Sequence, residues 1–114
     1  MWQVILHPAV QDWLDMQPKQ VRERFDQCTL VLTNVGPNLG RPLVDGVKGS
    51  TIHNLKELRV QSGSNSSIRA LFVFDPKRQA IVLVVGDKAG EWNSWYEENL
   101  SLAEERYEEY LNHG

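Results

Sequence analysis

Three short runs of β-forming residues lie close together in the second half of the chain. They cover residues 54–61, 67–74 and 80–86, and only a few turn-forming residues separate one run from the next. This spacing predicts two consecutive β-hairpins whose strands run antiparallel. The last run, AIVLVVG, is apolar on both of its faces. Such a strand lies within a sheet that is covered on both sides, or on one side with the other half covered.

Another strand and two helices are predicted before these runs. A β-branched run over 2–6 predicts a first strand that ends at a proline. Apolar residues at intervals of three and four predict a short helix over 8–16 and a longer helix over 18–35, which a glycine and a proline then stop. Residues 37–53 have several glycines and prolines and no sustained period, so we expect a loop there.

Two helices are predicted after the last strand. Aromatic residues at helical spacing predict the first of them over 92–99. Ser101 and Glu104 match a capping box, which predicts a separate helix over 102–111. The expected fold class is therefore α+β: a small, mostly antiparallel sheet with two N-terminal helices and C-terminal helices packed on it.

The composition is that of an ordinary globular protein able to bury a core, with 114 residues of which 41% are hydrophobic and 24% charged. We expect one domain over residues 1–114. A single cysteine, Cys28, and three dispersed histidines give no metal-ligand spacing, so we expect a reduced protein without a metal or other cofactor. No leader-like start and no stretch of roughly 18 apolar residues occurs, which predicts a cytoplasmic protein without a membrane partner.

Charge is distributed unevenly along the chain. The formal net charge is −3, but residues 41–90 carry +4 and residues 91–114 carry −6. The hairpin region is therefore a cationic block within an acidic protein. This pattern is compatible with one face that meets phosphate groups and with an acidic C-terminal segment that is solvated or meets a basic partner.

An arginine stands in each strand of the first hairpin. If the turn is centred on Ser64, Arg59 and Arg69 pair directly across the ladder and share one face with Glu57. Like charges in this arrangement are destabilising unless a carboxylate or a bound anion lies between them. Two interpretations are open: a structural ion-pair triad with Glu57, or a clamp in which both guanidinium groups bind a phosphodiester.

Further candidate residues lie near this hairpin. Lys88 follows the last strand and adds a third cation if that strand neighbours the hairpin. Lys56 is expected on the face opposite the arginines. His53 is either a general base or an incidental loop residue. Three aromatic side chains are expected mostly in the core, with one exposed ring able to stack on an RNA base: Trp92, Trp95 and Tyr96.

Several motifs in succession resemble a known family. They are GRPLV (40–44), KGS (48–50), HNLKELR (53–59), SIRALFVFDP (67–76), GDKAG (86–90) followed by WNSWYEE, and LAEERYEEYL (102–111). Together they resemble the RelE/HigB-type toxins of bacterial type II toxin–antitoxin modules, and in particular the phage-derived HigB-like branch. The resemblance covers essentially the whole chain.

The resemblance implies metal-independent cleavage of mRNA at the ribosome and neutralisation by a cognate antitoxin, often one with a helix-turn-helix domain. By position it implies that Arg59, Arg69 and Lys88 are the cations that stabilise the reacting phosphate, and that Tyr96 stacks on or orients the nucleotide. Because the HigB branch places functional side chains near its C-terminus, Tyr110 and His113 are alternatives to Tyr96.

The acid and base of such a reaction would come from Glu57, Lys56 or His53. Lys56 and His53, with Arg41 and Lys48, are also the expected RNA-binding residues. The chain departs from well-studied ribonucleases of the family, which are strongly basic, because it is acidic and has Glu57 where another cation is expected. Two alternatives therefore stand beside the endoribonuclease: a toxin of the same fold that poisons an enzyme such as DNA gyrase, and an inactive relative that only binds its antitoxin.

Overall fold

The computed structural model describes residues 1–61 and 66–113, which form five strands, three α-helices and one short 3-10 helix. Their bounds are Gln3–Leu6 (β1), Pro8–Asp15 (α1), Lys19–Val35 (α2), Gly36–Asn38 (η1), Val44–Gly46 (β2), Lys56–Val60 (β3), Ile68–Asp75 (β4), Gln79–Asp87 (β5) and Trp92–His113 (α3). The strands form one sheet in the order β1-β5-β4-β3-β2.

The sheet is mostly antiparallel, as predicted. Strands β2, β3, β4 and β5 pair antiparallel in succession, whereas β1 pairs parallel with β5. The apolar strand β5 is an interior strand between β1 and β4. The expected turn at Ser64 lies outside the described residues. The prediction of a continuous loop over 37–53 was wrong at β2, whose three residues pair with β3 although they show no alternating pattern long enough to detect.

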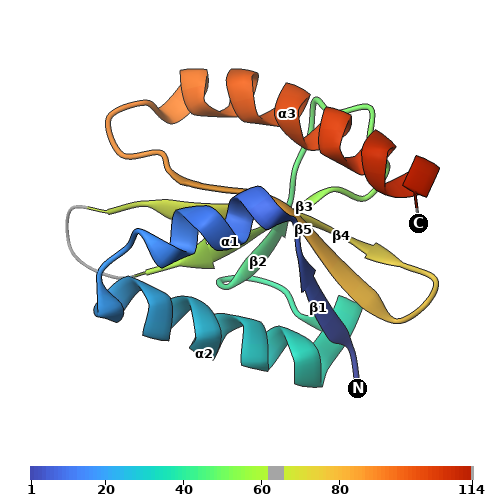
Figure 1. Cartoon of the computed structure of the whole chain (residues 1–114), viewed down its shortest axis with the longest axis horizontal. Coiled ribbons are helices and arrows are strands. Elements are labelled where there is room, and N and C mark those ends of the chain that lie inside the picture. Colours follow the sequence, from blue (N-terminus) through green and yellow to red (C-terminus); the bar gives the residue numbers. More distant parts are fainter. Residues whose placement is uncertain (62–65, 114) are drawn as a thin grey trace.

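Helices cover both faces of the sheet, so the molecule has three layers (Figure 1). Helices α1 and α2 lie against one face, where their buried residues pack with alternate residues of β3, β4 and β5. Helix α3 lies against the other face and packs with the remaining set of strand residues. Strand β4 is consequently buried along its length except at Phe74, and Phe72 is fully buried. Burial of this strand on both faces fixes its register, because a slip of one residue exchanges the two faces.

The start of α1 and the end of α2 lie where proline and glycine predict them. Pro8 stands in the first turn of α1, where its missing N–H costs nothing, and His7 Nδ1 accepts a hydrogen bond from the backbone N–H of Ala9 at 3.0 Å. Helix α2 ends at Gly36, whose φ of 70° lies in the left-handed region that favours glycine.

Helix α3 is one continuous helix of 22 residues, so the prediction of two C-terminal helices was wrong. The proposed capping box lies inside this helix. Glu104 does not cap it: its Oε2 accepts hydrogen bonds from the Ser50 hydroxyl and the Thr51 backbone N–H, both at 2.8 Å. The Ser–Glu spacing therefore reflects a tertiary contact between α3 and the loop before β3.

A β-bulge in β5 decides which side chains reach the α3 face. The register shifts between Leu71 and Phe72 of β4, and in β5 the consecutive residues Leu83 and Val84 both pack on the α3 side. Beyond the bulge the alternation is reversed, so Gly86 pairs with Arg69 on the α3 side. A Cβ atom on Gly86 would lie 2.9 Å from Nε1 of Trp95, so glycine is needed for α3 to approach.

No helix in residues 1–61 and 66–113 combines the length and the apolar character that a membrane span requires.

Substitutions at Ser101 test the continuity of α3. Inside a continuous helix, Ser101→Ala should raise the free energy of unfolding by up to about 0.5 kcal/mol, because alanine has the higher helix propensity, and Ser101→Gly should lower it by a similar amount. At an N-cap the order of the two variants is reversed, because alanine costs about 1 kcal/mol and glycine only a few tenths. Urea unfolding of both variants distinguishes the two, and a less stable alanine variant would contradict a continuous helix.

Candidate functional site

The two hairpin arginines lie opposite one another, as predicted. Arg59 pairs with Arg69 in the β3–β4 register, and both side chains lie on the α3 face with Glu57. Arg59 Nη2 lies 3.7 Å from Glu57 Oε1, and Arg69 Nε lies 3.8 Å from Glu57 Oε2. One carboxylate therefore separates two guanidinium groups at ion-pair distances that are too long for hydrogen bonds.

Helix α3 contributes a tyrosine to this arrangement. The Tyr96 hydroxyl lies 2.7 Å from Glu57 Oε2 and 3.0 Å from Oε1, so it donates its hydrogen to the carboxylate. The same hydroxyl oxygen accepts a hydrogen bond from Lys88 Nζ at 3.0 Å. The predicted catalytic residues thus form one connected group, which we call the cationic cluster: Glu57, Arg59, Arg69, Lys88 and Tyr96.

A second carboxylate, which the sequence analysis did not identify, forms an ion pair with Arg59. Asp45 of β2 pairs with Glu57 in the sheet, and its Oδ2 lies 3.1 Å from both Arg59 Nη2 and Arg41 Nε. Asp45 stands within the segment that was predicted to be a loop. The signal that could have revealed it was the repulsion between the two arginines, which one carboxylate only partly relieves.

Positive charge exceeds negative charge in this group. Arg59, Arg69 and Lys88 face two carboxylates, Glu57 and Asp45. The Nε atoms of both arginines are buried and find no hydrogen-bond partner in the described part of the chain. Because a buried donor without a partner costs free energy, such atoms often mark a position that a ligand completes.

The cluster is more enclosed than a freely open clamp. Glu57, Arg69 and Lys88 have exposed fractions of 5%, 8% and 8%, whereas the Arg59 side chain is 33% exposed. Lys88 Nζ lies between two aromatic rings, 4.4 Å from the centroid of Trp92 and 4.8 Å from that of Tyr96. An anion from solvent therefore meets Arg59 before Arg69.

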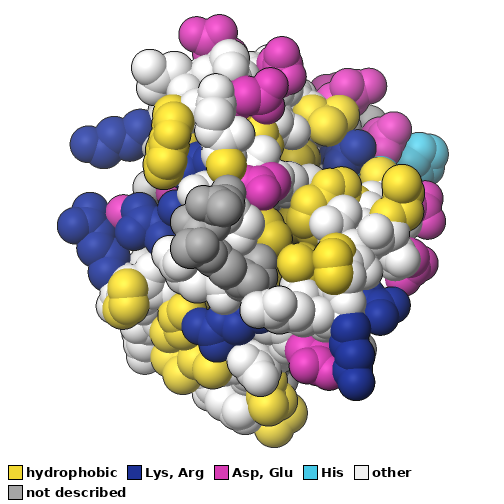
Figure 2. Space-filling model, turned by 90° about the vertical axis from the view of Figure 1, so that its left-hand side faces the viewer, with side chains coloured by type: hydrophobic (Ala, Val, Ile, Leu, Met, Phe, Trp, Pro, Cys, Tyr) yellow, Lys and Arg dark blue, Asp and Glu magenta, His cyan; other side chains and the backbone are white. Residues whose placement is uncertain are grey.

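Two neighbouring hollows lie beside the cluster, and the smaller one reaches two of its residues. The first, of about 220 Å³, is lined by the segment 46–48 together with Glu57 and Tyr96. The second, of about 420 Å³, shares that segment and is lined as well by Arg41, Lys56 and residues beside them. Lys48 borders both hollows. Figure 2 shows basic side chains that project together at one edge of the molecule, while acidic side chains gather along the top, where α3 runs.

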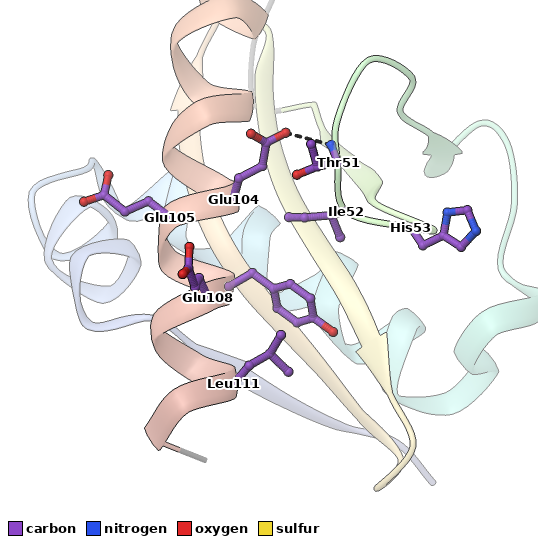
Figure 3. Close-up of a pocket in the computed structure, with 8 residues that line it drawn as sticks. Thr51, Ile52, His53, Glu104, Glu105, Glu108 and Leu111 are labelled. Carbon is purple, nitrogen blue, oxygen red and sulfur yellow. Dashed lines mark hydrogen bonds between the residues drawn. The ribbon is translucent and has the colours of Figure 1, made fainter.

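The structure separates three candidate residues from the cluster. His53 borders a different hollow, of about 540 Å³, which the C-terminal half of α3 lines with three glutamates, and Figure 3 shows its ring turned away from that helix. Tyr110 donates a hydrogen bond at 2.7 Å to Asp75, at the opposite end of β4 from Arg69. His113 lines a fourth hollow, beside β1. Tyr96, and neither of the two C-terminal alternatives, is the residue that contacts Glu57.

The environment of the cluster shifts the pKa values of several groups. Burial, followed by the hydrogen bond to Glu57, raises the pKa of Tyr96 to about 12. Burial, followed by the charge of Arg69, lowers the pKa of the Lys88 ammonium below its usual value. The hydrogen bond from Arg41 is the largest of the effects that lower the pKa of Asp45. Lys88 is therefore a better proton donor than a free lysine.

Comparison with solved structures shows a RelE-like fold. The structure resembles an archaeal RelE in the RelE–RelB complex from Pyrococcus horikoshii OT3, with a TM-score of 0.59, 19% identity, and coverage of 76% of this chain and 94% of the other. It also resembles an arginine-to-alanine double mutant of the E. coli toxin RelE in the free state, with a TM-score of 0.64, 15% identity, and coverage of 92% and 96%.

Comparison of sequences shows the family. Residues 12–108 match the family described as "Phage derived protein Gp49-like (DUF891)". Two Mycobacterium tuberculosis proteins are 46% identical to the chain. The match to "Putative toxin HigB3" covers 95% of this chain and 92% of that protein, and the match to "Putative toxin HigB2" covers 87% and 49%, so the chain spans about half of HigB2. The chain belongs to the Gp49-like family and is of the HigB/RelE toxin type, which confirms the resemblance seen in its motifs.

The raised pKa of Tyr96 predicts a pH dependence of stability. The pKa of a tyrosine in the unfolded chain is about 10, whereas the pKa of Tyr96 in the folded protein is about 12. Since the folded state keeps its proton to higher pH, the stabilisation by Tyr96 is fully present below about pH 10 and is lost as the pH rises towards about 12. Urea unfolding across this range should show the decline, and Tyr96→Phe should reduce it.

Tyr110→Phe is the matched control, because Tyr110 lies far from the cluster. The pKa of Tyr110 is also raised to about 12, but the largest cause of this shift is the hydrogen bond to Asp75. An NMR titration of the tyrosine rings gives the individual values. Titration of Tyr96 near its unfolded value would contradict the hydrogen bond to a buried Glu57.

Proposed function

We propose that this HigB/RelE-type toxin is a metal-independent endoribonuclease that inhibits translation by cleaving mRNA on the ribosome, in the cytoplasm. The observation that carries the proposal is the excess of cations in the cluster, together with two buried arginine Nε donors that have no hydrogen-bond partner among residues 1–61 and 66–113. Planar guanidinium groups suit the oxygens of a phosphodiester, and their positive charge stabilises the charge that develops when the phosphate is attacked.

The proposed reaction is an intramolecular transesterification, in which the ribose 2′-hydroxyl attacks the adjacent phosphodiester. Glu57 takes the proton from the ribose 2′-hydroxyl, and the 2′-oxygen forms a bond to the adjacent phosphorus as the bond from phosphorus to the 5′-oxygen of the next nucleotide breaks. Lys88 donates a proton to that 5′-oxygen, and Arg59 and Arg69 stabilise the pentacoordinate phosphorane. The products are a 2′,3′-cyclic phosphate and a 5′-hydroxyl end.

The position of each acid–base candidate supports this division of roles. Glu57 lines the smaller hollow, so a 2′-hydroxyl that enters there meets the carboxylate that both arginines face. Lys56 lines the neighbouring hollow instead, and His53 lines a hollow formed with α3. Burial lowers the pKa of Lys88, which makes its ammonium group a better proton donor than that of a free lysine. The Tyr96 hydroxyl, which contacts both Glu57 and Lys88, orients them.

The second hollow is proposed to hold the RNA backbone beyond the cleaved phosphate. Arg41, Lys48 and Lys56 line it, and Lys48 also borders the hollow that reaches Glu57. Arg41 and Lys56 therefore line a hollow that adjoins, at Lys48, the hollow that reaches Glu57. Contacts of this kind bind phosphates irrespective of sequence and weaken as the salt concentration rises.

Arg59→Ala tests the clamp. Loss of one preorganised donor to the developing charge should lower the cleavage rate of ribosome-bound mRNA by about 10²- to 10³-fold. Arg59 is the suitable first target because it is partly exposed, whereas Arg69→Ala leaves Glu57 buried with less compensation and risks destabilising the fold. Purified protein, ribosomes and a defined mRNA give the rate, and the chemistry of the new RNA ends is read in the same assay.

Arg22→Ala, at an exposed position on α2, is the control for a general loss of positive charge. Arg69→Lys tests the inner site, since it keeps the charge but removes the planar fork. An Arg59→Ala variant that cleaves as fast as the parent would reject the clamp. DNA breakage after induction without new mRNA ends would reject the nuclease and favour the gyrase poison, and a parent protein with no effect on growth would favour the inactive relative.

We propose in addition that a cognate antitoxin binds this toxin. In the archaeal structure, RelE is likewise found in a complex with RelB. The cationic cluster and its hollows suit an acidic segment that competes with RNA for Arg59 and the lysines around it. A small DNA-binding protein of helix-turn-helix type is the expected partner.

Co-expression tests this partnership. The small protein encoded beside the toxin gene should restore growth and co-purify with the toxin, and an excess of single-stranded RNA should weaken the complex if both bind the cluster. Arg22→Ala should leave the complex intact. A neighbouring protein that neither restores growth nor co-purifies would contradict the proposed partner.

A further inference from the structure

Trp92 leaves a large aromatic ring exposed at the edge of the cationic cluster. It is the first residue of α3, and 56% of it is exposed, whereas the other three tryptophans are buried or half-buried. Burying an indole ring contributes strongly to stability or to binding, so an exposed indole ring beside a charged site indicates a contact with a ligand. Neither the core nor the proposed catalytic residues need this ring to be exposed.

The ring is held next to one of the cations of the cationic cluster. Lys88 Nζ lies 4.4 Å from the centroid of the Trp92 ring and donates a hydrogen bond to the Tyr96 hydroxyl, which contacts Glu57. The ammonium group thus covers one face of the indole and also belongs to the cationic cluster. A cation and an aromatic platform are fixed side by side, which is the pairing that single-stranded RNA requires because phosphates and bases alternate along its chain.

We propose that Trp92 stacks on the base of a nucleotide that flanks the phosphate held by Arg59, Arg69 and Lys88, and that this contact makes the site prefer a purine there. The base stacks on the face of the indole that Lys88 leaves uncovered. A purine presents a larger ring than a pyrimidine and stacks more strongly, so the preference follows from stacking strength without hydrogen bonds to base edges. The inference rests on the proposed function and adds a nucleotide preference to it.

A structural role for Trp92 makes a different prediction. If the indole serves only to hold Lys88 in place through the cation–π contact, its removal weakens the binding of any phosphate chain, with or without bases. If the indole binds a base, its removal weakens only RNA that carries bases. The experiment must therefore compare ligands that share a backbone and differ in their bases.

Three 2′-O-methyl RNA decamers meet this need, because blocking the 2′-oxygen prevents cleavage. They carry ten adenines, ten uracils or no bases, and binding is followed by anisotropy of a terminal dye. Trp92→Ala should weaken binding of the adenine decamer about ten- to hundredfold, weaken the uracil decamer less, and leave the abasic decamer unchanged. Trp92→Phe should retain much of the adenine preference.

Leu111→Ala is the matched control, since Leu111 is a similarly exposed apolar residue (60%) at the other end of α3. It should leave all three affinities unchanged. Equal weakening of the adenine and abasic decamers by Trp92→Ala, or no weakening of either, would overturn the stacking role while leaving the proposed nuclease intact. A parent protein that binds none of the three decamers would also overturn the inference, whereas the proposed function is tested separately by the cleavage of mRNA on the ribosome.

Discussion

The burial of Glu57 is the constraint around which the site is organised. A carboxylate taken out of water is costly unless charges and hydrogen bonds compensate it. Here Arg59 and Arg69 supply the charges, and the Tyr96 hydroxyl supplies the hydrogen bond. These partners come from β3, β4 and α3, so the pairing register of the hairpin and the position of the helix on the sheet are linked through one side chain.

The same compensation explains how an acidic protein can hold a cationic site. The negative charge of the chain is concentrated in α3, whose exposed glutamates face solvent, while the site uses cations that the sheet and the following turn hold beneath the first turns of that helix. Glu57 and Asp45 balance part of this charge without neutralising it. Net charge alone was therefore a poor guide to the site, and the charge of the hairpin block was a better one.

Much of the sheet could be predicted from local pattern, because alternation and turn residues act over short distances. The pairing of Arg59 with Arg69 followed from counting residues to the centre of a turn. Strand β2 and its Asp45 could not be predicted this way, since a three-residue edge strand is defined by its partner and not by its own sequence. The helix start predicted at Ser101 was wrong for a related reason. The local capping-box spacing was present, but Glu104 forms its hydrogen bonds with Ser50 and Thr51 in a loop distant in the sequence.

The bulge at Leu83 and Val84 has a consequence for how such proteins diverge. Leu83 is the extra residue, because its neighbours Val82 and Val84 pair with the consecutive residues Phe72 and Leu71. Deleting Leu83 would therefore restore regular pairing, and Val84 and every residue beyond it would keep the face of the sheet that it has now. The length of this strand can thus change by one residue as relatives diverge without turning Lys88 away from α3, at the cost of the packing that Leu83 contributes to the core.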